Sequence, residues 1–314
     1  MSSTRTSLIA AALAAVALVP SSAAQGATTT LSTEQSATRV AAWESTIMWS
    51  RLDPASGRYA LMQSVDGASP TVVDVPERAG GPFDVDLGTN RFGSTIAVYT
   101  RHGDIYRLNV GAGTETKVAK LSSPKLVERD PTIQRDQIAF IRRNGRSDEL
   151  RIGNTTKSSR LLARGTILHA ELGDHHIAYV REAPSKYEGE QQMHVRNLTT
   201  GADRVVYVAR SGGANFANIT RASYVAKPEG FLWARTNIGS GRGNRIVRYT
   251  LRGSKLDYAK GESRYISTAW ANARLGAVTT STLAANETPD TCVDSASNYC
   301  GVMLTGPLTF GLQP

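Results

Sequence analysis

The sequence predicts an all-β fold, a six-bladed β-propeller with four-stranded antiparallel blades. A strand-like phrase of an aromatic residue, one spacer and an arginine occurs five times, with the aromatic residue at positions 49, 99, 140, 179 and 233. These positions are 39 to 54 residues apart, which is the length of one four-stranded blade. Further short strands follow each phrase and end at Gly, Asn, Ser or Asp, as turns between strands require.

The repeat units follow one another along the chain without a helical segment between them. After the phrase "IAVYTRHG" come "DIYRLNVG" and "ETKVAKL", and after "QIAFIRRNG" come "DELRIGN" and "SSRLLARG". A sixth, degraded unit contains "YISTAWA" and "LGAVTTS", in which threonine replaces the arginine. We therefore expect blades at residues 37–78, 82–123, 126–165, 166–211, 216–262 and 264–314.

The N-terminal residues 1–24 have the features of a secretory signal peptide. Arg5 precedes an apolar run from Leu8 to Val19, and small residues up to Ala24 form a cleavage site. The run is too short to span a membrane, so we expect an exported protein that is secreted or located in the periplasm or cell envelope. Residues 25–36 form an N-terminal segment before a propeller domain at 37–314. Either residues 28–33 or residues 308–312 supply the outer strand that closes the ring.

The amino-acid sequences of two units also resemble a known propeller repeat. "DPTIQRDQIAFIRR" (130–143) and, more loosely, "DLGTNRFGSTIAVYTR" (86–101) resemble the TolB-type, WD-like propeller repeat of exported bacterial proteins. The resemblance implies a propeller that serves as a protein-binding scaffold. Propellers with a similar blade pattern also occur in lyases and peptidases, so the fold leaves the function open.

The arginines of the repeated phrase define the first candidate site. Each lies two residues after its aromatic residue, so both side chains share one face of the strand. The aromatic residues themselves are expected to be buried as wedges between neighbouring blades. The five arginines, which should form a circle on one face of the propeller, are Arg51, Arg101, Arg142, Arg181 and Arg235. They serve either as structural latches that bind carbonyl groups of the next blade or as a cationic ring that binds an anionic ligand. The latch is the favoured interpretation.

Enlarged loops on the same face complete the predicted binding site. They lie at residues 182–190, 237–244 and 281–300, and they contribute Tyr187 and Arg242 as candidate binding residues. Variable loops on a rigid scaffold commonly carry binding sites. Cys292 and Cys300 are expected to form a disulfide within the last loop, because the exported protein meets an oxidising environment.

Motifs for catalysis are sparse. The chain contains no Gly-x-Ser-x-Gly, His-Glu-x-x-His or paired Cys-x-x-Cys motif, so we predict no catalytic residue, metal or cofactor. On the expected inner strands the ionisable candidates are Asp84 or Asp86, Asp130, His169 and Glu171, apart from Glu44 and Arg221.

The sequence thus favours a monomeric, non-catalytic binding scaffold, with a lyase or hydrolase acting on an acidic glycan as the alternative. The formal net charge of +9 favours an anionic partner. The expected partner is a protein or an anionic envelope polymer, without nucleic acid binding or a membrane span.

Overall fold

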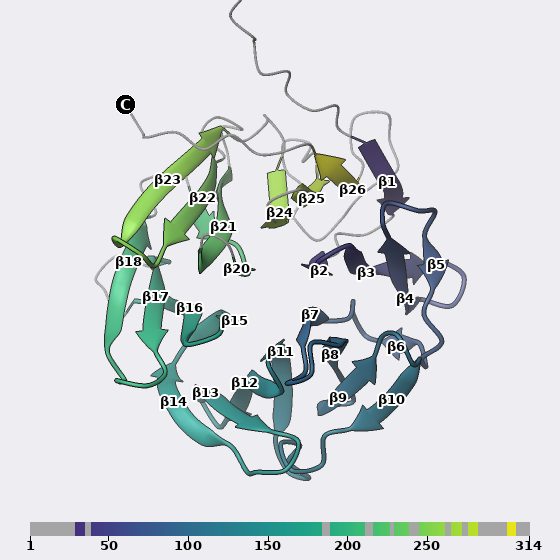
Figure 1. Cartoon of the computed structure of the whole chain (residues 1–314), viewed down its shortest axis with the longest axis horizontal. Helices are drawn as coiled ribbons and strands as arrows, with labels where there is room; N and C mark the ends of the chain where they lie inside the picture. Colours follow the sequence, from purple (N-terminus) through teal and green to yellow (C-terminus); the bar gives the residue numbers. More distant parts are fainter. Residues whose placement is uncertain are drawn as a thin grey trace, which may run out of the picture.

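The computed structural model describes residues 29–34, 39–183, 189–210, 216–226, 229–238, 245–260, 265–271, 276–281 and 300–305. These residues form antiparallel β-sheets that surround a central axis (Figure 1). The prediction of an all-β propeller with four-stranded antiparallel blades is confirmed.

Five blades are each built from one continuous segment, and the first strand of each lies nearest the axis (Figure 1). Blade 1 contains β2 (Ala41–Trp43), β3 (Thr46–Asp53), β4 (Arg58–Val65), β5 (Thr71–Val72) and β6 (Arg78–Ala79). Blade 2 contains β7 (Asp86–Thr89), β8 (Thr95–Arg101), β9 (Asp104–Asn109) and β10 (Thr114–Lys117). Blade 3 contains β11 (Val127–Gln134), β12 (Gln137–Asn144), β13 (Ser147–Asn154) and β14 (Arg160–Gly165). Blade 4 contains β15 (Ile167–Leu172), β16 (His176–Glu182), β17 (Gln191–Asn197) and β18 (Asp203–Ala209). Blade 5 contains β19 (Phe216–Ile219), β20 (Ser223–Ala226), β21 (Glu229–Ile238), β22 (Arg245–Thr250) and β23 (Lys255–Lys260).

The remaining sheet is composite and joins the two ends of the described chain. It contains β24 (Tyr265–Ala271), β25 (Gly276–Ser281), β26 (Cys300–Thr305) and β1 (Thr29–Glu34), in this order from the axis outward. The sequence predicted six blades, whereas five continuous blades are found and this last sheet needs a strand from the N-terminal segment. β1 pairs with β26, so the N-terminal candidate takes the outer place, and residues 308–312 lie outside the described residues.

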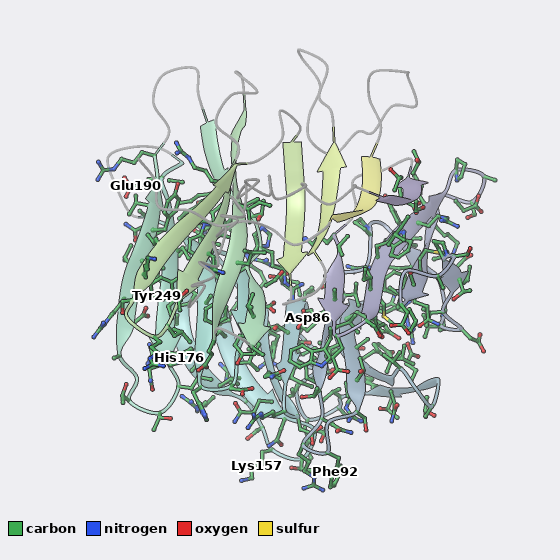
Figure 2. All side chains as sticks on the ribbon, turned by 45° about the horizontal axis from the view of Figure 1, so that its top comes forward. Asp86, Phe92, Lys157, His176, Glu190 and Tyr249 are labelled. Carbon is green, nitrogen blue, oxygen red and sulfur yellow. The ribbon has the colours of Figure 1, made fainter. Side chains whose placement is uncertain are left out.

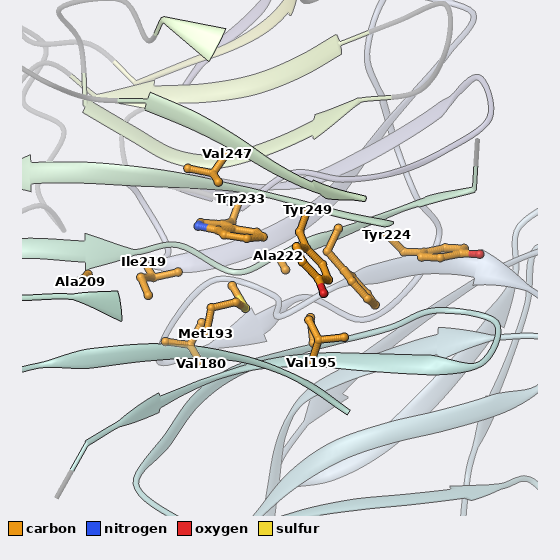
Figure 3. Packing of buried hydrophobic residues seen from close by; sticks show 12 residues of the cluster. Val180, Met193, Val195, Ala209, Ile219, Ala222, Tyr224, Trp233, Val247 and Tyr249 are labelled. Atoms are coloured by element: carbon orange, nitrogen blue, oxygen red, sulfur yellow. The ribbon is translucent and has the colours of Figure 1, made fainter. Parts of the chain in front are cut away.

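The hydrophobic core lies between neighbouring blades. The second strand of each blade is apolar on both faces, and the aromatic residues of the repeated phrase are at most 2% exposed. Figure 3 shows this packing where Val180 and Met193 of blade 4 meet Trp233 and Val247 of blade 5. The expected role of the aromatic residues as wedges between blades follows from this burial, because each removes a large apolar area from water.

The propeller has two faces that carry different connections. The turns between second and third strands lie on one face with the links between blades, and we call it the connection face. The turns between first and second strands lie on the opposite face, which we call the turn face. In Figure 2 Glu190 lies toward the connection face, whereas Phe92 and Lys157 lie at the far edge of the turn face.

Glu34 fixes the composite sheet to blade 1. Its carboxylate is 2% exposed and accepts hydrogen bonds from Trp49 Nε1 at 2.7 Å and from Arg51 Nε at 3.2 Å. Ser32 Oγ donates a further bond to the same carboxylate, and Arg51 Nη2 donates to Ser32 Oγ at 2.9 Å. β1 therefore carries a buried charge whose partners belong to the neighbouring blade.

Replacing Glu34 with alanine should lower the free energy of unfolding by about 3 kcal/mol, because the buried Trp49 Nε1 and Arg51 lose their acceptor. Urea denaturation of the purified protein measures this loss. The matched control is Glu77→Ala, since Glu77 is 47% exposed and pairs with Arg58 at 3.3 Å. The control should cost less than about 1 kcal/mol. Equal, small losses in both variants would show that Glu34 does not hold the sheet in place.

Candidate functional site

Three of the five predicted arginines are held by carboxylates. Arg51 pairs with Glu34, and Arg101 pairs with Glu115 through both terminal nitrogens at 2.6 and 2.9 Å. Arg142 Nε donates to Glu128 Oε1 at 2.7 Å, and its Nη2 donates to the carbonyl oxygen of Leu121 at 2.7 Å. The expected carbonyl partners in the next blade are thus replaced mainly by carboxylates, which bind a guanidinium more strongly.

The other two arginines, Arg181 and Arg235, lack such a carboxylate in the described part of the chain. The Nε atoms of both are buried and have no hydrogen-bond partner there. Arg181 ends β16 in blade 4 and Arg235 lies on β21 in blade 5, so they belong to adjacent blades. The circle of five arginines therefore divides into three that are neutralised within the fold and two with unused donors.

The candidate loop residues lie outside the described residues. These are Tyr187 and Arg242, and the same holds for Cys292 of the predicted disulfide, whereas Cys300 begins β26. The structure therefore places Arg181 and Arg235 at the bases of the two loops that carry Tyr187 and Arg242, because β16 and β21 lead into these loops.

A buried group of charges occupies the axis of the propeller. Its members come from the inner strands, from the segments beside them and, for Arg78, from β6, and we call them the axial cluster: Arg39, Arg78, Asp84, Asp86, Asp130, His169, Glu171 and Arg221. Figure 2 shows Asp86 in the interior of the ring.

Arg221 is the centre of the axial cluster. Its side chain is 6% exposed and lies 3.4 Å from Asp86, 3.5 Å from Asp130 and 3.5 Å from Glu171. It also donates to the carbonyl oxygens of Val85 at 3.3 Å and Pro131 at 3.0 Å. One guanidinium group from blade 5 thus contacts three blades across the axis.

The axial carboxylates also bind backbone N–H groups of the next blade. Asp86 accepts from Ile133 N at 2.9 Å, Asp130 from Ala170 N at 3.1 Å and Glu171 from Tyr224 N at 2.9 Å. Thr132 Oγ1 does the same for Leu172 N at 2.9 Å. These bonds link blades 2, 3, 4 and 5 in succession near the axis. The bond to Asp130, whose carboxyl group is kept ionised by its arginines, is charge-assisted and therefore stronger than a bond between neutral groups.

The protonation of the axial cluster follows from its charges. Burial would raise the pKa of Asp130, but Arg221 and Arg39 outweigh it and hold this pKa well below its usual range. Burial and the nearby Asp86 raise the pKa of Glu171 well above its usual range. Burial also raises the pKa of Asp86. Four carboxyl groups (Asp84, Asp86, Asp130, Glu171) face three guanidinium groups (Arg39, Arg78, Arg221), and this excess of one carboxyl group favours the protonated form of Glu171.

His169 lies at the connection-face side of the axial cluster as a neutral group. Burial and the positive charge of Arg39 lower the pKa of His169. Its Nδ1 lies 3.2 Å from Arg39 Nη2 and 3.6 Å from Asp130. Neutral His169 accepts a hydrogen bond from Arg39, which is itself bonded to Asp130. The side chain of Arg39 is 33% exposed and that of His169 is 23% exposed.

The described residues contain no group of three or more His, Cys, Asp or Glu side chains arranged to hold a metal ion. The described part of the chain also has no helix long and apolar enough to cross a membrane. Asp84 or Asp86, Asp130, His169, Glu171 and Arg221 were predicted from the sequence as ionisable residues of the inner strands, whereas Arg39, Arg78 and the contacts within the cluster were not predicted. The pattern in the sequence that could have indicated these contacts is the recurrence of acidic or threonine residues in "DVDL", "DPTI" and "HAEL".

Comparisons with known proteins support the fold. No protein-family model and no curated protein sequence matches the chain. An oligogalacturonate lyase in complex with manganese is similar in structure, with a TM-score of 0.58, 11% identity and coverage of 91% of this chain and 94% of that one. A luciferin-regenerating enzyme gives a TM-score of 0.55 at 9% identity, with coverage of 92% and 97%. TolB from Acinetobacter baumannii gives a TM-score of 0.50 at 14% identity, with coverage of 85% and 65%. At these identities the likeness shows a β-propeller fold that binding proteins and enzymes share.

Proposed function

We propose that this protein is a non-catalytic binding scaffold that holds an anionic envelope polymer on its connection face. The observation that carries the proposal is the pair Arg181 and Arg235, whose buried Nε atoms have no partner in the described part of the chain. The other three arginines are paired with carboxylates, whereas these two partly exposed guanidinium groups have none in the described part of the chain and could bind a carboxylate or phosphate of the ligand. Guanidinium groups bind both anions with two parallel bonds.

The axial cluster supports a structural use of the acidic side chains. Asp86, Asp130 and Glu171 each accept a backbone N–H of the next blade and each lies within 3.5 Å of Arg221. A carboxylate that serves as catalytic base must be able to reach a substrate proton. The oxygens of these three groups are instead occupied by protein donors.

The proposal also covers the closure of the ring, the export of the protein and the loops of the binding site. We infer that the composite sheet acts as a sixth blade that closes the ring, with β1 as its outer strand. The protein is exported after removal of residues 1–24, and it acts as a monomer. Cys292 and Cys300 form a disulfide that fixes the last loop, and Tyr187 and Arg242 complete the binding site beside Arg181 and Arg235.

Binding of polygalacturonate and of polyphosphate to the purified protein tests this function, with isothermal titration calorimetry as the measurement. The double variant Arg181→Gln/Arg235→Gln should bind the preferred polymer at least about tenfold more weakly, because charge-assisted bonds are lost. Arg58→Gln is the control, since Arg58 is 48% exposed, is paired with Glu77 and belongs to blade 1. Unchanged binding by the double variant would contradict the proposed site.

A glycan lyase or hydrolase is the second candidate function. The observation in its favour is that the environment lowers the pKa of Asp130 and raises the pKa of Glu171, as occurs in acid–base pairs of enzymes. The same polymers should therefore be assayed for new reducing ends and unsaturated uronides. Release of either product by the wild-type protein, together with its loss in Glu171→Gln, would replace the binding function with an enzymatic one.

A further inference from the structure

Phe92 protrudes from the turn face. Its side chain is 78% exposed, and no other large apolar side chain of the described residues is as exposed. Figure 2 shows Phe92 and Lys157 at the extremity of this face, on the side away from Glu190. Phenylalanine is among the side chains that proteins bury at the boundary of a membrane when they bind at its surface.

The loop that carries Phe92 is held in one conformation by its own hydrogen bonds. Asn90 Oδ1 accepts from Phe92 N and Ser94 N, both at 2.9 Å, and Asn90 N donates to the carbonyl oxygen of Ser94 at 3.0 Å. Gly93 has a φ of 86°, a conformation that glycine adopts without strain. The exposure of Phe92 is therefore built into the loop.

A hairpin turn of blade 3 supports the same loop from the side. Arg135 and Asp136 have φ values of 48° and 64°, which are uncommon for residues with a side chain. Asp136 Oδ2 accepts a hydrogen bond from Arg91 N at 3.1 Å, and Asp136 N donates to the carbonyl oxygen of Thr89 at 3.0 Å. A two-residue type I′ turn between antiparallel strands requires positive φ at both positions, so this turn is well defined.

Cationic side chains of blades 2 and 3 lie on the same face as the phenyl ring. The guanidinium carbon of Arg91 lies 4.7 Å from the centre of the Phe92 ring. Arg135 is 62% exposed, and Lys157 is also exposed. The nearby acidic groups are Asp136, 27% exposed and paired with Arg107, and Asp174, 19% exposed and paired with Arg135. The exposed charge around Phe92 is therefore positive.

We propose that the turn face of blades 2 and 3 docks on an anionic phospholipid surface. Phe92 enters the boundary between headgroups and acyl chains, while Arg91, Arg135 and Lys157 contact phosphate groups. Interfacial binding combines buried apolar area with attraction to anionic lipids, and this surface offers both. A protruding side chain can enter a broad, deformable surface such as a membrane. The positive charge of the neighbouring side chains is complementary to anionic headgroups. This site is separate from the polymer site on the connection face.

Sedimentation with vesicles tests the proposal on the purified protein. We expect binding to vesicles of phosphatidylcholine with phosphatidylglycerol, little binding to phosphatidylcholine alone, and a decrease as salt rises. Phe92→Ala should lower the partition coefficient by about tenfold through the lost apolar burial. Arg91→Gln and Arg135→Gln should each lower it by about fivefold, as expected for one cation near an anionic surface.

Two control variants test whether vesicle binding depends on this surface rather than on any exposed apolar or cationic side chain of the protein. Val72→Ala removes an apolar side chain that is 65% exposed on β5 of blade 1. Arg164→Gln removes a guanidinium group that is 65% exposed and paired with Glu149. Both should bind vesicles like the wild type. Equal losses in the controls, equal binding to neutral vesicles, or absence of vesicle binding would overturn the proposal. Self-association that depends on Phe92, measured by analytical ultracentrifugation without vesicle binding, would assign this surface to a second copy of the chain instead.

Discussion

Replacing Asp130 with asparagine is expected to lower the free energy of unfolding by about 3 kcal/mol, because it removes one charge from a buried network. Asp130 is 3% exposed and pairs with Arg221 and Arg39. Its φ is 52°, and asparagine tolerates this conformation as well as aspartate does. Asparagine also retains an oxygen that can accept from Ala170 N. The loss in urea denaturation therefore reports the missing charge.

Asp136→Asn is the matched control for this prediction. Asp136 also has a positive φ, of 64°, and it pairs with Arg107 at 3.3 Å. Its side chain is 27% exposed, so water screens the pair and the substitution should cost less than about 1 kcal/mol. If Asp130→Asn were no more costly than Asp136→Asn, the axial charges would not hold the blades together.

Replacing Arg142 with alanine should cost about 3 kcal/mol, whereas Arg181→Ala should change stability by less than about 1 kcal/mol. The carboxylate of Glu128 is fully buried, so loss of Arg142 leaves it without its cation and leaves the carbonyl of Leu121 without a donor. Arg181 has no carboxylate partner in the described residues, so its removal unpairs no buried charge.

Arg142→Lys serves as the second variant for this prediction. An ammonium group cannot reproduce the two directed bonds that the guanidinium makes to Glu128 and Leu121, so lysine should recover little of the lost stability. Urea midpoints of the three single variants, measured without ligand, give the comparison. Equal midpoints for Arg142→Ala and Arg181→Ala would remove the distinction between latched and ligand-binding arginines.

The sequence allowed the architecture to be predicted because the propeller repeats a local pattern. Alternating and continuous apolar residues determine which strand faces are buried, and this predicted the wedges at Trp49, Tyr99, Phe140, Tyr179 and Trp233. The sequence did not determine which segment forms the outer strand of the composite sheet, because β1 and β26 are far apart in the sequence. Pairing of distant strands leaves no periodic signal.

The partners of the arginines were not predictable from a common motif. Glu34 lies on β1 of the composite sheet, Glu115 on the fourth strand of blade 2 and Glu128 on the first strand of blade 3. The same holds for the axial cluster, where Arg221 contacts residues of blades 2, 3 and 4. These contacts depend on how blades face one another across the ring, which strand periodicity does not determine.

The central claim is that the axial cluster is a charge-balanced structural centre with a proton on Glu171. The most direct measurement is the free energy of unfolding of Glu171→Gln relative to wild type as a function of pH. The folded pKa of Glu171 is raised by burial and by Asp86. Its contribution to stability is therefore full below the ordinary glutamate pKa of about 4.3 and is lost as pH rises toward the folded pKa. We predict that glutamine, which mimics the protonated acid, costs less than about 1 kcal/mol at neutral pH, and that its stability relative to wild type improves as pH rises through this window. A loss at neutral pH as large as that of Asp130→Asn would show that Glu171 is a required anion, and would contradict the account.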